Sequence, residues 1–291
     1  MIDVRGYLRE ETMPHVLCPG CAHGIVLRAL IEAIAARGLS KDEVALVAGI
    51  GCSSRLVGHV DVCTLHATHG RAPAFATGIK LSRPEMTVAV ITGDGDGLAI
   101  GGNHLIHAAR RNIDLTCLLF NNSIYGMTGG QLGPTTPQGA VASTSPFGNP
   151  ESPFDACKLM EGAGATFVAR VAAFEEPVLA SVIAAALAHK GFAFIDVISD
   201  CPVYFGRYNH GGEGPEMLMA MKRHDTAIDA VLATKRFVPH IQETPAAQTL
   251  PTGILHRADR PEFSQVCRQA HPVAGSGSIA PPETEGGAGE G

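Results

Sequence analysis

Short apolar runs that end in glycine or polar residues are the feature that most constrains the fold of this chain. Residues 44–50, 86–92 and 115–120 form three such runs. Continuous apolar runs of this length are typical of parallel strands buried on both faces of a sheet. We also expect helices at 23–37, 103–111, 155–161 and 176–190 and strands at 166–170 and 192–199. This alternation predicts an α/β fold, a doubly wound parallel sheet whose ligands bind where loops leave the carboxyl ends of the strands.

The domain organisation follows from where this alternation ends. We expect one domain at 1–210 and a C-terminal extension of irregular pattern at 211–274, which packs on the domain or on a partner. The extension should contain a helix near 215–232. Residues 275–291 are rich in Gly, Pro and Glu and have no core pattern, so we expect a flexible tail there.

Composition and charge argue against several classes of partner. Apolar residues make up 45% of the chain, yet no apolar run reaches the roughly eighteen residues that a membrane span needs. The 22 basic residues are scattered and the net charge is -6, so we expect neither nucleic acid nor an anionic membrane as a partner. Residues 1–9 are charged throughout and have no signal-peptide core, which predicts a cytoplasmic location.

Polar residues follow two of the predicted strands, and their spacing in the sequence suggests a shared site. Residues 93–96 read Gly-Asp-Gly-Asp, residues 121–122 read Asn-Asn, and Asp94 and Asn122 lie 28 positions apart. One strand, one helix and a second strand fit into that interval and bring both side chains to neighbouring strand ends. Carboxylate and amide oxygens are ligands that Mg²⁺ prefers, and a glycine-rich turn lets backbone N–H groups approach phosphate. Either half alone would also suit an ordinary turn, but together they favour a magnesium-diphosphate site.

Four of the eight cysteines could converge on one site, because two of them fall at the edge of the sheet where a cofactor should bind and two form a tight turn. Cys18 and Cys21 form a Cys-Pro-Gly-Cys turn, Cys52 follows the first strand and Cys201 follows the last. In a reducing compartment such a set more often binds metal than forms disulfides. Four thiolates suit zinc or a [4Fe–4S] cluster equally well, so this pattern leaves both open.

Taken together, these motifs resemble a known family across roughly residues 10–210. The Cys-Pro-Gly-Cys turn, Gly-Cys-Ser-Ser at 51–54, His-Ala-Thr-His-Gly-Arg at 66–71, Gly-Asp-Gly-Asp with Asn-Asn, and the late Cys-Pro are similar to the beta subunit of 2-oxoacid:ferredoxin oxidoreductases. The resemblance implies thiamine diphosphate held through Mg²⁺, beside one [4Fe–4S] cluster. Cys63, Cys157 and Cys267 receive no role from it, and Cys117 has the pattern of a small core residue.

The resemblance also implies a role for individual residues. The Mg²⁺ ligands would be Asp94, Asn122 and the backbone carbonyl of Ile124, and the cluster ligands Cys18, Cys21, Cys52 and Cys201. His69 would donate to the diphosphate, although a loop histidine without a function is the alternative. Arg55 would meet a substrate carboxylate, although a solvated surface arginine is equally compatible with its position. The expected cofactor neighbours are Ile50, Gly51, Cys52, Ser53, His69, Gly95, Asp96, Gly126 and Met127.

The reaction implied is the thiamine-dependent oxidative decarboxylation of a 2-oxoacid with coenzyme A, with electrons passing through the cluster to ferredoxin. Residues 125–131, Tyr-Gly-Met-Thr-Gly-Gly-Gln, resemble the 2-oxoglutarate branch and favour succinyl-CoA as the product, with pyruvate or a branched-chain 2-oxoacid as alternative substrates. The chain offers no second, pyrimidine-binding domain with an activating glutamate. We therefore expect an alpha subunit as partner and a dimer of alpha-beta heterodimers.

Two rival functions make different demands on the sequence. A non-redox thiamine-dependent decarboxylase subunit would need the magnesium motif but not four convergent cysteines. A non-catalytic, zinc-stabilised binding module would need the cysteines, and the magnesium motif would then be a coincidence.

Overall fold

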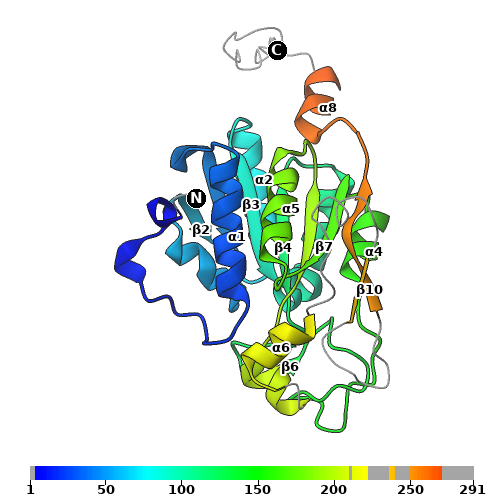
Figure 1. Ribbon diagram of the computed structural model, residues 1–291. Helices are drawn as coiled ribbons and strands as arrows, with labels where there is room; N and C mark the ends of the chain where they lie inside the picture. Colours follow the sequence, from blue (N-terminus) through cyan, green and yellow to red (C-terminus); the bar gives the residue numbers. More distant parts are fainter. Residues whose placement is uncertain (1–3, 210–211, 222–235, 240–248, 271–291) are drawn as a thin grey trace, which may run out of the picture.

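Figure 1 shows the chain as a computed structural model that describes residues 4–209, 212–221, 236–239 and 249–270. Its strands are β1 (Val44–Ala48), β2 (Cys63–His66), β3 (Thr87–Gly93), β4 (Thr116–Asn121), β5 (Ile124–Tyr125), β6 (Gln131–Leu132), β7 (Phe167–Ala172), β8 (Ala193–Ile198), β9 (Arg236–Pro239) and β10 (Thr249–Arg257). Its α-helices are α1 (His23–Ala36), α2 (Ala72–Ser82), α3 (Gly102–Arg110), α4 (Ala156–Gly162), α5 (Glu176–Ala188), α6 (Gly214–Met221) and α8 (Phe263–Ala270). Shorter helical turns are η1 (Arg5–Tyr7), η2 (Glu10–Thr12), η3 (Lys41–Glu43), η4 (Ser53–His59), η5 (Gly95–Ile100) and η6 (Pro202–Gly206).

Eight strands form one sheet in the order β2-β1-β3-β4-β8-β7-β10-β9. The six strands from β2 to β7 are parallel, whereas β10 runs antiparallel to β7 and β9 antiparallel to β10. The predicted α/β fold with a mostly parallel sheet is therefore confirmed. Part of the segment expected as a C-terminal extension returns to this sheet as β10. The tail expected at 275–291 lies outside the described residues, as does the expected helix beyond α6.

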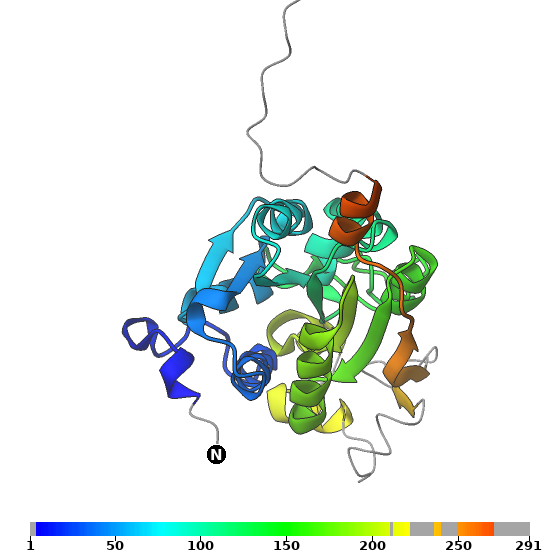
Figure 2. The same cartoon turned by 90° about the horizontal axis from the view of Figure 1, so that it is seen from above.

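Helices cover both faces of the sheet, as Figure 2 shows from above. α1, α5 and η4 pack on one face, and α2, α3 and α4 pack on the other. The strand residues between them are buried throughout in β1, β4, β7 and β8, which explains why these strands read as continuous apolar runs. No helix in the described part of the chain has both the length and the apolar character that crossing a membrane requires.

The neighbouring strands β1 and β3 form the topological switch point of the sheet, because the strands that follow them in the chain are added on opposite sides. The chain leaves β1 through η4 on one face and pairs outward with β2, whereas it leaves β3 through η5 and α3 on the other face and pairs with β4. Such a reversal opens a crevice at the carboxyl ends of the two strands, and ligands of open α/β sheets bind in it. The hairpin of β5 and β6 and the helix α6 lie at this end of the sheet (Figure 1).

Candidate active site

A cavity of about 120 Å³ lies in this crevice, and we call it the strand-end cavity. Its walls come from the loops that follow β1, β3 and β4 and from the hairpin that begins at β5. The structure brings together here every residue expected to surround the diphosphate and its metal: Ile50, Gly51, Cys52, Ser53, His69, Asp94, Gly95, Asp96, Asn122, Ile124, Gly126 and Met127. Tyr125 and Thr128 also line it, and both belong to the loop at 125–131 that the sequence associates with the substrate. His23 and Phe120 line it as well, and the sequence had not indicated them.

Asp94 is a buried carboxylate whose orientation is fixed by three hydrogen bonds. Its Oδ1 accepts from the Gly95 N–H at 2.7 Å, and its Oδ2 accepts from the Ser123 N–H at 2.8 Å and the Thr135 hydroxyl at 2.7 Å. A carboxylate has about four acceptor positions, so one remains on Oδ1. Burial raises the pKa of Asp94 to about 6. A cation in this cavity would stabilise the charge that burial disfavours.

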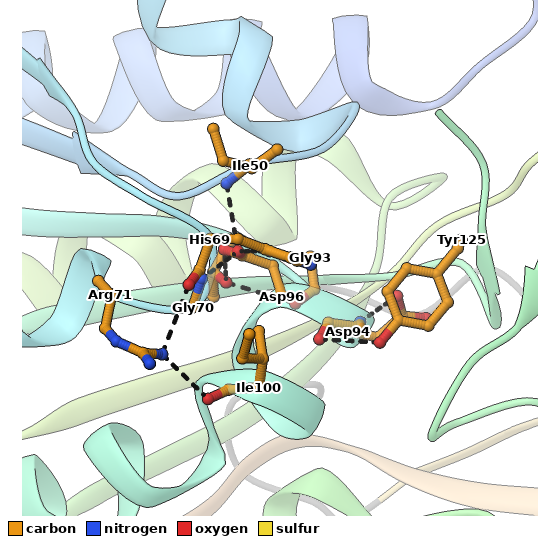
Figure 3. A network of polar contacts seen from close by, with 11 residues as sticks. Ile50, His69, Gly70, Arg71, Gly93, Asp94, Asp96, Ile100 and Tyr125 are labelled. Atoms are coloured by element: carbon orange, nitrogen blue, oxygen red, sulfur yellow. Dashed lines mark hydrogen bonds and ion pairs between the residues drawn. The ribbon is translucent and has the colours of Figure 1, made fainter. Parts of the chain in front are cut away.

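Asp96, by contrast, holds the loops around the cavity together (Figure 3). Its Oδ1 accepts from the backbone N–H of Ile50 at 3.2 Å and of Gly70 at 2.7 Å, and Oδ2 accepts from the Thr92 hydroxyl at 2.6 Å. The Nδ1 atom of His69 contacts the same Oδ1 at 2.5 Å. Because an ionised carboxylate only accepts, Nδ1 is a protonated nitrogen, and Nε2 of His69 is left for the cavity.

The second glycine of the turn is required by a close contact. A Cβ atom on Gly95 would collide with the ring of Tyr125, whose hydroxyl donates to the Gly95 carbonyl at 3.2 Å. Tyr125 belongs to β5, which pairs with β6 at Gln131. The Gln131 side chain in turn donates to the Thr128 carbonyl at 2.7 Å. The hairpin at 125–131 is thus fastened directly to the turn that carries Asp94.

The two asparagines of the Asn-Asn pair serve different sides of the sheet edge. Asn122 lines the cavity, and its Oδ1 accepts weakly from the Ile124 N–H at 3.3 Å. Asn121 turns into the protein, where its side-chain amide donates to Asp196 at 3.1 Å. The next residue, Ser123, has a φ of 62°, a left-handed conformation that directs its N–H to Asp94. The bend therefore places Asn122 and Asp94 at one cavity.

A second cavity, of about 310 Å³, adjoins the first, and we call it the cysteine cavity. The structure brings Cys18, Cys21, Cys52 and Cys201 to its walls, together with Arg55. In the parts of the chain that are described, no three His, Cys, Asp or Glu side chains are arranged to hold one metal ion. The four thiols instead surround an open space.

Burial governs the pKa values of the thiols in this cavity. It raises the pKa of Cys21, and the nearby backbone of His23 partly offsets the rise. Burial likewise raises the pKa of Cys201, partly offset by the backbone of Phe205 and Tyr204, and raises that of Cys52 to about 11. Because burial disfavours an isolated thiolate, this cavity suits thiolates that are bound to a positive centre.

The two cavities share a wall made of His23, Cys52, Asn122, Gly126 and Met127. The wall is thin at Gly126, because a Cβ atom on this residue would lie 3.4 Å from the sulfur atoms of both Cys52 and Cys201. Among the remaining cysteines, Cys117 is completely buried in the core, as its place in an apolar strand predicts. Cys157 is also buried, whereas Cys63 is exposed on β2 and Cys267 is half-buried on α8.

Comparison with known proteins agrees with this geometry. Residues 49–197 match the family model of the C-terminal TPP-binding domain of thiamine pyrophosphate enzymes. The 2-oxoglutarate synthase subunit KorB of Methanothermobacter marburgensis is 51% identical over 75% of this chain and 76% of its own length. Subunit beta of the 2-oxoacid:ferredoxin oxidoreductase 2 of Aeropyrum pernix is 39% identical over 69% of this chain and 65% of its own length.

A solved structure extends the likeness to most of the chain. The 2-oxoglutarate:ferredoxin oxidoreductase of Magnetococcus marinus, solved with 2-oxoglutarate, coenzyme A and succinyl-CoA bound, matches with a TM-score of 0.77 and 35% identity. The match covers 92% of this chain and 89% of the other. Fold and site thus define the TPP-binding domain of a thiamine pyrophosphate enzyme. More narrowly, the chain belongs to the family of 2-oxoacid:ferredoxin oxidoreductase beta subunits and is most like its 2-oxoglutarate branch.

Proposed function

We propose that the chain is the catalytic beta subunit of an enzyme that converts 2-oxoglutarate, coenzyme A and two oxidised ferredoxins to succinyl-CoA, CO₂, two reduced ferredoxins and a proton. The observation that carries this proposal is the wall shared by the strand-end cavity and the cysteine cavity. A thiamine site and a redox centre on the two sides of one wall are what an oxidative decarboxylation needs, whereas a simple decarboxylase needs only the first.

The strand-end cavity fits thiamine diphosphate and its Mg²⁺. Asp94 has one acceptor position left, Asn122 offers its amide oxygen, and the backbone carbonyl of Ile124 follows two residues later. Nε2 of His69 is not engaged by Asp96, and it would donate to a diphosphate oxygen in the imidazolium form, in which both ring nitrogens carry a proton. The bound cofactor would supply the nucleophilic carbon for attack on the 2-oxo group. This chain's own residues would hold its charged end.

The cysteine cavity fits a [4Fe–4S] cluster better than zinc. A zinc ion needs four sulfur atoms that converge on one point at about 2.3 Å, whereas here the four thiols border an open volume. The Gly20 φ of 78° makes the tight turn that presents Cys18 and Cys21, and Gly20 packs against Gly214 of α6. The cluster would supply a one-electron acceptor beside the thiamine site.

Arg55 supports a carboxylate-bearing substrate. It lies in η4, three residues after Cys52, where it is exposed and lines the cysteine cavity. A guanidinium there can form charge-assisted hydrogen bonds with a carboxylate of the 2-oxoacid. The names of the most similar relatives reported above and the 125–131 hairpin favour 2-oxoglutarate as that acid.

We further propose an alpha subunit, with the pyrimidine-binding domain, as an obligatory partner in a dimer of alpha-beta heterodimers. Among the described residues that line the strand-end cavity there is no glutamate to activate the thiamine ring. Ile50 and Met127 line this cavity and are 40% and 44% exposed, which is typical of a surface that another chain covers.

The deciding experiment is anaerobic purification of the chain with its alpha partner, followed by iron and sulfide analysis and a panel of 2-oxoacids with coenzyme A and ferredoxin. We expect about four irons per chain, as a [4Fe–4S] centre requires, and the highest kcat/KM with 2-oxoglutarate. Cys201→Ala should lower the iron content, whereas Cys63→Ala, on the exposed strand β2, should not. Thiamine-dependent decarboxylation without iron would instead identify a non-redox decarboxylase subunit.

A further inference from the structure

His23 is a buried polar side chain that the described protein leaves without a partner. It is the first residue of α1 and is only 1% exposed, yet neither Nδ1 nor Nε2 has a hydrogen-bond partner among the described residues. Leaving a buried polar group unsatisfied destabilises the folded protein, so buried imidazoles normally have a partner. The partner of His23 is therefore expected among groups that bind to the protein.

The position of the ring limits what those groups can be. His23 belongs to the wall between the strand-end cavity and the cysteine cavity, so only an occupant of one of them can reach it. Phe120 packs edge-on against the imidazole, with ring centroids 5.0 Å apart at 78°. Phe120 lines the strand-end cavity but not the cysteine cavity. Phe120 therefore offers the imidazole an apolar contact and no hydrogen-bond acceptor at the strand-end cavity.

The cysteine cavity offers sulfur acceptors to this ring. Cys18, Cys21, Cys52 and Cys201 line it together with His23. Burial raises the pKa values of Cys21 and Cys201, and the nearby backbone partly offsets both shifts. A neutral imidazole has one N–H, which would add a side-chain donor to this cavity.

We propose that the imidazole N–H of His23 donates a hydrogen bond to a sulfur atom of the four-cysteine centre and thereby raises the reduction potential of that centre. The inference rests on the proposed function, because it needs the cluster in the cysteine cavity. Reduction adds negative charge to the cluster, and a donor to sulfur stabilises the reduced form more than the oxidised form. His23 is then a positioning and tuning residue between the cofactor and its electron acceptor.

The test compares His23→Phe, His23→Leu and His23→Gln in the complete complex with the alpha subunit. Phe and Leu remove the donor, whereas Gln keeps an N–H group. His59→Phe is the matched control, because His59 is also buried, at 4% exposed, and also has an unpartnered Nε2, but it lines neither cavity. The readouts are the midpoint potential from a redox titration followed by electron paramagnetic resonance, the iron content, and the dissociation constant of thiamine diphosphate with Mg²⁺.

We expect Phe and Leu to shift the reduction equilibrium about tenfold toward the oxidised cluster, which for one electron is about 59 mV more negative. The Gln variant should recover part of this shift, and His59→Phe should leave the potential of the wild type. Iron content and thiamine affinity should stay near wild-type values in the variants.

Three results would overturn the inference or its basis, and they are distinguishable. An intact cluster with an unchanged potential in both Phe and Leu variants would show that His23 does not donate to it. Weaker thiamine binding at an unchanged potential would assign the imidazole to the cofactor instead. Wild-type complex without iron would refute the proposed cluster itself, whatever the variants do. If the complex does not assemble with His23→Phe, the midpoint potentials of His23→Leu and His23→Gln decide.

Discussion

Single residues of the turn at 93–96 show how much the sequence could say about the site. The motif predicted Asp94 as a metal ligand, the family resemblance added Asp96 as a cofactor neighbour, and both line the strand-end cavity. Only the structure separates their tasks. The two carboxylate oxygens of Asp96 accept hydrogen bonds from Ile50, Gly70, Thr92 and His69, whereas Asp94 keeps one free acceptor position. The difference depends on residues far away in the sequence, which local spacing does not describe.

The Asn-Asn pair offers a matched test of the magnesium site. Asn122→Ala should weaken Mg²⁺-dependent binding of thiamine diphosphate by roughly ten- to a hundredfold, the value of a hydrogen bond or ligand to a charged group, without unfolding the protein. Asn121→Ala should leave this affinity close to wild type but lower the free energy of unfolding by about 1–3 kcal/mol, because Asp196 loses a buried donor. Calorimetric titration and circular dichroism measure the two effects.

Asp94→Ala should abolish Mg²⁺-dependent binding of thiamine diphosphate. It also removes the acceptor of three donors at once, so this variant should lose stability as well as affinity. Wild-type affinity in both Asn122→Ala and Asp94→Ala would exclude this cavity as the magnesium site.

Substitution of Arg55 tests which carboxylate of the substrate this side chain binds. Arg55→Ala should lower kcat/KM for 2-oxoglutarate by about 1.5–3 kcal/mol in activation free energy, roughly ten- to a hundredfold. If Arg55 binds the distal carboxylate, turnover of pyruvate, which lacks that group, should change far less. If it binds the carboxylate that leaves as CO₂, both substrates should suffer alike. Arg37→Ala, at the exposed end of α1, is the control and should have wild-type activity.

Higher kcat/KM for pyruvate than for 2-oxoglutarate in the wild-type complex would contradict the interpretation of the 125–131 hairpin, and would leave the thiamine and cluster assignments intact.

At the scale of elements, the sequence predicted the interior of the sheet and missed its edges. β1, β3, β4, β7 and β8 and the helices α1, α3, α4 and α5 were expected within a few residues of their observed ends. These elements are buried on their inward faces, so their apolar pattern is strong. The edge strand β2 is exposed or half-buried throughout and has no such pattern. β10 was missed because its place depends on pairing with β7, which lies far away in the sequence.

A buried ion network joins the elements behind the site. Arg170 of β7, 1% exposed, donates to Asp196 of β8 at 2.8 Å and to Asp155, the N-cap of α4, at 2.6 Å. Arg170→Met should lower the free energy of unfolding by about 3–5 kcal/mol, because it leaves a buried carboxylate uncompensated. Lys158→Ala, which breaks an exposed ion pair to the same Asp155, should stay within about 0.5 kcal/mol of wild type.

Denaturation followed by circular dichroism suits this comparison, because the chain has no tryptophan. Adding Asp196→Asn to Arg170→Met should recover part of the loss. An additive double variant would show that the pair is not coupled.

For the whole molecule, the site forms only because distant parts of the chain meet at one end of the sheet. Three separate segments supply Cys18 with Cys21, Cys52, and Cys201 to one cavity. The sequence placed Cys52 and Cys201 at strand ends, and the parallel sheet explains why those ends coincide. It did not place the loop at 18–21, whose position depends on α1 and on the contact of Gly20 with α6. The division into two cavities, and His23 between them, likewise follows from tertiary packing alone.

The surface around the strand-end cavity gives a prediction for the assembly. Ile50 and Ile100 lie on either side of His69 in Figure 3, and Ile100, 50% exposed, lies against Gly70 beside the cavity. Ile100→Glu should weaken association with the alpha subunit by at least about tenfold, because a charge would be buried in an apolar contact. Val266→Glu is the control: Val266 is 47% exposed, but α8 lies at the opposite end of the sheet (Figure 1).

Titration of each variant against the alpha subunit, followed by analytical ultracentrifugation, gives the two dissociation constants. Circular dichroism checks that both variants fold, as surface substitutions should allow. Turnover per assembled complex should be close to wild type for Val266→Glu. Equal loss of association in both variants would show that charge alone disturbs the assembly. Equal affinity of Ile100→Glu and wild type would place the alpha subunit on another face, and the activating glutamate would then have to reach the strand-end cavity from there.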